Sequence, residues 1–363
     1  MCVTHWTRRA ACLCLILSAL VATSSAWASP WTLPNDELAL RVGYDIQTAS
    51  EEFLQDGTQQ AYPLDGQFFS STLSLDARYG VNSKLEVAIR GTFRHSSYES
   101  DPLLLRLPES GTLEDTRTSI QDVEDTAMGI GDILLATRYN FHRSWLLVTG
   151  ELQAKIPTGY DSPSGFNVAL GDGQVDVIPS LLLGTYIDST QSFVRMDIGY
   201  NVRLGGPGHQ ALVGLKAGQF VTQSFIVIAG VDVAQTLFDG ETFGDSFVVR
   251  QPEVPYDQLD PDSIEVIPLS LDRDAVRAEI GAILRVESVE LVFGYSRVFS
   301  GRNTASLHSL NIGFATSLPS FTGEKPPEQE PTPEESTPEE TLPAPVPLPA
   351  TEDDGTPMNS YLF

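Results

Sequence analysis

The sequence predicts an all-β protein, a transmembrane antiparallel up-and-down β-barrel of about 12 strands, with 14 as the alternative count. Three observations lead to this prediction. Segments of about ten residues alternate apolar and polar side chains, which is the length and period of a tilted strand that crosses a bilayer. Aromatic residues flank the short turns between these segments. Long, polar, acidic connections alternate with those turns, as they do in barrels of the outer membrane.

The first 28 residues have the three parts of a secretory signal peptide. Arg8 and Arg9 supply positive charge, residues 10–22 form an apolar stretch, and Ala26-Trp27-Ala28 provides a small-x-small cleavage site before Ser29. The apolar stretch is too short to span a membrane as a helix, which favours a cleaved signal over an uncleaved anchor. The predicted units are a signal peptide, a β-barrel and a tail, at residues 1–28, 29–317 and 318–363.

Composition excludes several kinds of chemistry. All three cysteines, Cys2, Cys12 and Cys14, lie in the predicted signal peptide, so the mature chain has no thiol for a disulfide or a thiolate metal site. Loss of Arg8 and Arg9 takes the formal net charge from −26 to −28, which argues against nucleic acid as a partner. We expect no cofactor.

Charged residues fix which face of each strand meets lipid. No stretch after Ser29 approaches 18 apolar residues, so only a closed barrel could span a membrane. In the segment Val194 to Val202, apolar residues alternate with Arg195 and Asp197, and an Arg on the lipid face would cost roughly 2 to 4 kcal/mol. The charges therefore point into the lumen. By the same logic, strands lie at about residues 38–46, 73–79, 85–94, 130–141, 145–156, 174–186, 193–203, 210–220, 225–235, 275–284, 289–299 and 306–316.

The connections sort by parity. Those after even-numbered strands are short, and the long ones follow odd-numbered strands, at residues 48–67, 95–129, 157–173 and 236–274. Short turns are periplasmic in such barrels, so we expect both termini on the periplasmic side. The last of these loops contains ten Asp or Glu against two Arg, and its apolar alternations predict a projecting hairpin or, in the 14-strand count, two further wall strands.

Inward-facing positions carry ten cations and nine anions, which predicts charge ladders that either brace the barrel or line a narrow pore. The residues selected as lumen-lining candidates are Arg41, Asp76, Arg78, Glu86, Arg90, Arg138, Glu151, Lys155, Arg195, Asp197, Arg277 and Glu279. The remaining inward charges are Asp45, Arg94, Asp132, Asp176, Arg203, Lys216 and Asp232.

No catalytic or metal-binding motif is present in the sequence. The mature chain has four histidines, His95, His142, His209 and His308, and none has a Gly-x-Ser-x-Gly nucleophile motif as a partner. The acidic clusters lack the glycine-containing spacing of a calcium loop, so a solvated surface is the preferred interpretation. We therefore predict that the protein is not an enzyme.

The composition changes at Pro319. From there on, ten acidic residues stand against Lys325 alone among Glu-Pro-Thr repeats, which predicts a disordered acidic periplasmic tail. The chain ends in Phe363, the residue type that the barrel-insertion machinery commonly recognises at a C-terminus, so we expect that machinery as a partner. Coincidence is the alternative, because the last predicted strand ends about forty residues earlier.

The most specific local pattern is rich in glycine. Gly129-Ile130-Gly131-Asp132 opens one strand, Pro157-Thr158-Gly159 ends the next, and Gly171-Asp172-Gly173 precedes the third. No helix follows, so this is not a phosphate-binding loop. Together with Tyr79-Gly80 and Gly199-Tyr200, these motifs resemble the outer-membrane transporter family associated with the meta-pathway of phenol degradation.

The resemblance extends over about residues 37–316 and implies a monomeric barrel that passes small, hydrophobic or aromatic compounds. The favoured hypothesis is a passive channel, embedded in outer-membrane lipid and lipopolysaccharide of a Gram-negative cell, with a small-molecule solute as its partner. Its selectivity would come from the lumen charges and the long outer loops. The alternative is a non-conducting structural or adhesion barrel with acidic extracellular loops. A secreted soluble β-sandwich is the third hypothesis.

Overall fold

The computed structural model describes residues 29–319, except for 63–64, 109–115, 161–167, 169, 172, 239, 241, 250–263 and 271. The predicted signal peptide and nearly all of the predicted tail lie outside the described residues. Among the residues that are described, no helix combines the length and the apolar character needed to cross a bilayer.

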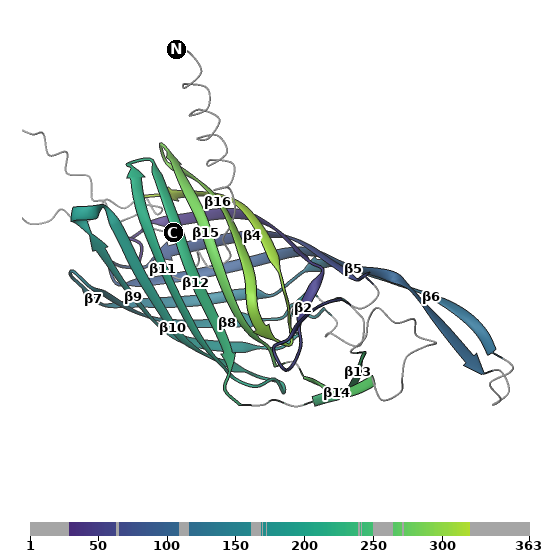
Figure 1. Cartoon of the computed structure of the whole chain (residues 1–363). Coiled ribbons are helices and arrows are strands. Elements are labelled where there is room, and N and C mark those ends of the chain that lie inside the picture. Colours follow the sequence, from purple (N-terminus) through teal and green to yellow (C-terminus); the bar gives the residue numbers. More distant parts are fainter. Residues whose placement is uncertain are drawn as a thin grey trace, which may run out of the picture.

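Twelve strands form one closed antiparallel barrel, as predicted (Figure 1). Each wall strand pairs with the next one along the chain, and β18 pairs with β1 to complete the ring. The wall strands are β1 (Leu38–Ala49), β4 (Gln67–Gly80), β5 (Leu85–Pro108), β7 (Ile133–Arg143), β8 (Leu147–Ile156), β9 (Asp176–Ile187), β10 (Ser192–Arg203), β11 (Gln210–Thr222), β12 (Phe225–Thr236), β15 (Asp274–Val286), β16 (Val289–Arg302) and β18 (His308–Leu318). The other described elements are β2 (Glu51–Phe53), β3 (Gln59–Ala61), β6 (Thr116–Ile130), β13 (Thr242–Val249), β14 (Ile264–Ser270), β17 (Thr304–Ala305) and the 3-10 helix η2 (Asp188–Thr190).

The predicted strand register is confirmed. Apolar side chains such as Leu75 and Ile89 are exposed on the outside of the wall, at 57% and 48% of their surface. The alternate charged side chains, Arg41 and Arg195 among them, are buried inside. A soluble domain would bury the first set and hydrate the second, so the barrel is inverted in the way that a lipid surrounding requires.

The connections follow the predicted parity, and three long ones contain strands, the first of them the short pair β2 and β3. β5 and β6 continue as a paired hairpin through the predicted loop 95–129 and extend beyond the rim of the barrel (Figure 1). The prediction of a loop there was wrong, because beyond the membrane a strand needs no lipid-facing alternation. β13 and β14 pair only with each other, so this loop holds a separate hairpin and the alternative count of 14 wall strands is wrong.

The aromatic residues at the short turns do not all face outward. Phe141 and Trp145 are exposed on the outside, at 63% and 79%. Tyr186, Phe193 and Phe220, by contrast, belong to an apolar cluster inside the barrel. These three pack against a segment that the sequence pattern did not place.

Candidate functional site

The short-turn half of the lumen is filled by residues Ser29–Leu33, here called the N-terminal plug. Its side chains are almost completely buried, with Trp31 at 4% and Leu33 at 3% exposed. The Trp31 ring meets the Phe193 ring edge-on, with the centroids 5.9 Å apart. The remaining buried members of this cluster come from β8, β12, β15 and β16, and they are Leu147, Ile226, Ile283 and Val292.

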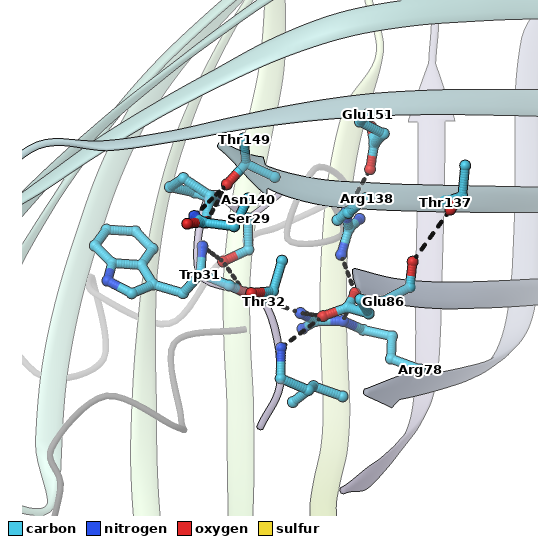
Figure 2. A network of polar contacts seen from close by, with 12 residues as sticks. Ser29, Trp31, Thr32, Arg78, Glu86, Thr137, Arg138, Asn140, Thr149 and Glu151 are labelled. Atoms are coloured by element: carbon cyan, nitrogen blue, oxygen red, sulfur yellow. Dashed lines mark hydrogen bonds and ion pairs between the residues drawn. The ribbon is translucent and has the colours of Figure 1, made fainter. Parts of the chain in front are cut away.

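The backbone of the N-terminal plug is bound by side chains of the wall (Figure 2). The Thr149 hydroxyl donates to the Pro30 carbonyl at 2.6 Å, and Arg78 Nη2 donates to the Trp31 carbonyl at 3.3 Å. The Leu33 amide donates to Glu86 Oε2 at 2.9 Å. Buried backbone groups need hydrogen-bond partners, and these side chains of the wall provide them for the plug.

Beneath the plug lies a network of four predicted site residues (Figure 2). Glu86 is 0% exposed and accepts hydrogen bonds from Arg78 at 2.8 Å and from Arg138 at 2.7 Å. Arg138 Nε also donates to Glu151 at 2.5 Å. Two guanidinium groups and two carboxylates therefore neutralise each other, which is the condition for keeping charges buried.

Two glycines make room for the N-terminal plug and for Pro34, the residue that follows it. A Cβ at Gly184 would lie 2.4 Å from Cγ of Pro30, and a Cβ at Gly80 would lie 1.8 Å from the Pro34 carbonyl oxygen. No side chain fits at either contact. Gly80 belongs to the Tyr79-Gly80 motif, so this part of the motif has a steric reason in the contact with the N-terminal chain.

On the long-loop side of this network, the lumen holds a cavity of about 220 Å³. Its wall runs from β18 through β1, β4 and β5 to β8, and its lining is polar or charged except for Leu134 and Leu170. Three predicted site residues, Arg41, Arg90 and Lys155, line it. The cavity is therefore a hydrophilic chamber with two apolar contacts.

The cations of this cavity differ in how they are paired. Arg90 forms an ion pair with the predicted site residue Asp76, and Lys155 forms one with Asp176 at 2.6 Å. Arg41 and Arg94 have no ion-pair partner among the described residues. Arg41 donates only to the side-chain carbonyl of Asn311, at 3.4 Å, and Arg94 only to the hydroxyl of Thr72, at 3.2 Å.

The glycine motifs meet at the mouth of the cavity. The Tyr160 hydroxyl donates to the Asp132 carboxylate and accepts from the Gly173 amide at 3.1 Å. The Thr158 hydroxyl donates to the Ile130 carbonyl at 2.8 Å. These bonds hold the connection between β8 and β9 against the start of β7. Sequence reasoning identified the glycine motifs but missed Tyr160, which lies in an aperiodic segment.

Leu170 is held against the same glycines. A Cβ at Gly129 would lie 2.9 Å from Cδ1 of Leu170, and a Cβ at Gly131 would lie 3.2 Å from the Leu170 carbonyl oxygen. The glycines thus admit this leucine to the cavity lining. Leu170 was also missed, because it stands outside any alternating segment.

The other four predicted site residues, Arg195, Asp197, Arg277 and Glu279, lie on β10 and β15, away from the cavity lining. Arg277 binds Asp232 at 3.0 Å, and Glu279 forms an ion pair with Lys216. Arg195 Nε lies 3.9 Å from the Asp197 carboxylate. The structure therefore divides the predicted site into three groups. One holds the plug, one lines the cavity or, as Asp76 does, pairs with a residue that lines it, and one forms ion pairs within β10 and between β15 and the strands β11 and β12.

Comparison with solved structures agrees with the fold. The chain is similar to an outer membrane channel from Pseudomonas putida F1, with a TM-score of 0.56, 11% identity, and coverage of 82% of this chain and 100% of that chain. The P. putida toluene transporter TodX has a TM-score of 0.38 at 12% identity, covering 81% and 92% of the two chains. The translocator domain of the autotransporter NalP from Neisseria meningitidis has a TM-score of 0.37 at 13% identity, covering 86% and 95%. No family model and no curated protein matches the sequence. At this level of identity, the similarity to the P. putida F1 channel shows that the chain has the same kind of closed β-barrel.

Proposed function

We propose that the protein is a monomeric outer-membrane channel for the passive uptake of small, hydrophobic or aromatic compounds. The observation that carries this proposal is that the lumen holds a cavity in its long-loop half, while its short-turn half, beyond the ion network, is filled by the separate segment Ser29–Leu33 rather than by the wall itself. A plug held by hydrogen bonds and one apolar cluster can leave the lumen without breaking the barrel. A barrel with a purely structural role has no need of a chamber inside.

The surroundings follow from the same geometry. The exposed apolar outer face fits outer-membrane lipid, and the charged inner face fits water and solute. The proposal includes cleavage before Ser29, which would place the mature N-terminus in the lumen, and a tail that extends from β18 on the periplasmic side. Aromatic compounds as solutes are supported by the likeness of the glycine motifs to the family of the meta-pathway of phenol degradation.

Planar-bilayer recordings on the refolded protein test the proposal. We expect small, infrequent openings for the intact protein and a several-fold higher mean conductance for a variant that lacks residues 29–32. A variant that lacks β13 and β14 is the control, since that hairpin pairs with no wall strand. If the variant without the plug is as closed as the control, the alternative of a non-conducting structural or adhesion barrel is favoured.

A further inference from the structure

We infer that the lumen cavity is a binding site for a solute that carries a carboxylate on a small apolar or aromatic body. This inference rests on the proposed channel function, because it names the class of solute that the channel would take. It does not depend on the plug, which lies on the other side of the ion network.

The first argument is the state of two guanidinium groups. Arg41 is 8% exposed, and its Nε atom has no hydrogen-bond partner among the described residues. It lies close to Gly313, where a Cβ would be 3.3 Å from Nε. Arg94 likewise has no carboxylate within ion-pair distance in the described part of the chain. In the plug network, by contrast, Arg78 and Arg138 both bind carboxylates.

A guanidinium group with no carboxylate within ion-pair distance keeps hydrogen-bond donors that a ligand can use. Its planar fork of donors matches the two oxygens of a carboxylate, and such charge-assisted bonds are about twice as strong as neutral ones. A bound carboxylate would therefore provide the ion-pair partner that the described part of the barrel wall does not provide for Arg41 or Arg94.

The second argument is the shape of the barrel wall that β1, β4 and β5 form on one side of the cavity. On β1 and β4, residues Gly43 and Ser74 face each other, and Thr92 continues this row on β5. Arg41 lies in the row on one side of these small residues, and Arg94 in the row on the other side. Four residues separate the two charged rows, or roughly 13 Å along the strand. The small side chains leave this interval open.

The volume of the cavity and its two apolar contacts limit how large the apolar part of the solute can be. At about 220 Å³, the cavity is smaller than the ~300–1,000 Å³ typical of sites for drug-sized ligands. Leu134 lines it from β7, and Leu170 lines it from the connection that Tyr160 fixes. A single ring or a short alkyl chain could lie against these leucines while its carboxylate reaches an arginine.

Two carboxylates of the protein, Asp45 and Asp132, oppose this assignment, and Asp45 makes it testable. Asp45 lines the same cavity and has no ion-pair partner among the described residues. The lining holds four cations, Arg41, Arg90, Arg94 and Lys155, against these two carboxylates, so the side chains that face the cavity carry more positive than negative charge. Neutralising Asp45 should therefore improve the binding of an anion, while neutralising Arg94 should weaken it.

Isothermal titration of the full chain, folded in detergent, tests the site with benzoate and with its neutral counterpart benzyl alcohol. We expect benzoate to bind at least about tenfold more weakly to Arg94→Gln, which corresponds to the loss of one charge-assisted hydrogen bond. Asp45→Asn should bind benzoate more tightly than the unchanged protein. Arg302→Gln is the matched control, because Arg302 binds Asp274 at 3.0 Å and does not line this cavity. Benzyl alcohol should bind each protein weakly and with little difference.

Equal affinity of Arg94→Gln and Arg302→Gln for benzoate would overturn the inference. So would equal binding of benzoate and benzyl alcohol, or a weaker benzoate complex with Asp45→Asn. The heat-dependent mobility of each folded variant in gels controls for misfolding, and Arg41→Gln provides a second substitution with the same expected direction. Because titration needs no conduction, the two proposals fail separately. Benzoate binding with this pattern in a barrel that never conducts would support the site and contradict the channel.

Discussion

The two halves of the lumen are built from the same kinds of side chains but differ in how these side chains are paired. In the short-turn half, Arg78, Glu86, Arg138 and Glu151 pair with each other beneath the N-terminal plug, and the interior is packed as in a soluble core. In the long-loop half, cations line a cavity, and two of them, Arg41 and Arg94, form no ion pair with any described residue. The alternation rule that buries charges inside a barrel therefore does not say whether they will be satisfied.

What separates the halves is the source of the missing partners. The plug brings backbone groups and an apolar side chain into the short-turn half, so that its carboxylate and guanidinium groups complete their bonds. No segment of the described chain does the same for Arg41 and Arg94. The paired charges of the plug network thus help to hold the structure together, and the cations without ion pairs mark the part of the lumen that is open to a ligand.

The largest effect should come from Glu86→Ala. The substitution leaves the guanidinium groups of Arg78 and Arg138 buried without their shared carboxylate, and breaking a buried pair in this way costs roughly 3–5 kcal/mol. The midpoint of urea unfolding in lipid vesicles measures the loss. Arg94→Gln, in the open half, should change the stability by less than about 0.5 kcal/mol. Equal losses in the two variants would erase the distinction between the halves.

Trp31→Ala should free the plug more than it unfolds the barrel. Truncating a buried Trp costs about 3 kcal/mol or more, which would shift the balance between seated and released plug by roughly a hundredfold. The open probability in planar bilayers should rise accordingly. Trp145→Ala is the control, since Trp145 lies at the same end of the barrel but is 79% exposed on its outside. Unchanged gating in Trp31→Ala would mean that the plug does not obstruct the path.

A smaller, local effect is expected in the open half for Tyr160→Phe. The variant loses the hydrogen bond to the Asp132 carboxylate, a contact worth roughly 1.5–3 kcal/mol when the acceptor is charged. The Gly173 amide, which donates to the same hydroxyl, should then exchange its hydrogen about tenfold faster or more, while global stability stays the same. Tyr200→Phe removes a bond to His209 at a different loop and should leave Gly173 unaffected. Protection of Gly173 that survives in Tyr160→Phe would show that the loop is held by other contacts.

The smallest effect concerns Glu37, next to the plug. Burial raises the pKa of Glu37 above its usual 4.5, and a bond from Ser317 and the charge of Arg78 only partly oppose it. A raised carboxyl pKa stabilises the folded state below 4.5, and this contribution is lost as the pH rises through the raised value. Glu37→Gln should therefore be more stable than the unchanged protein at about pH 7 and equal to it at about pH 4. A difference that persists at the lower pH would point to packing rather than charge.

The barrel could be predicted because lipid imposes a strict pattern on its wall. On β1 and β10, the charged residues Arg41 and Asp197 fix the inward face, and every neighbour follows from the period of two. The same rule failed for residues 95–129, where β5 and β6 run beyond the membrane with water on both faces. Strand pairing there depends on backbone bonds, which leave little trace in the sequence.

The site could be predicted only as a set of inward positions. The alternating pattern predicts that Glu86 and Arg90 lie on the same face of their strand. It does not predict that Glu86 contacts the plug and that Arg90 lines the cavity. That division depends on where Ser29–Leu33 lies, and this short segment has no periodicity to place it. Trp31, a large apolar residue just after the predicted cleavage site, was the one available signal for an N-terminal segment that needs a buried partner.

The position of Trp31 also has a consequence for the order of assembly. The apolar socket for its ring takes residues from β8, β10, β12, β15 and β16, so it exists only after nearly the whole chain has been synthesised and its strands have paired. The plug precedes every other described residue in the chain, yet it is the last of them to pack, and contacts of such long sequence separation form slowly. A barrel that closed in the wrong register would lack this apolar cluster and would leave the indole ring of Trp31 exposed.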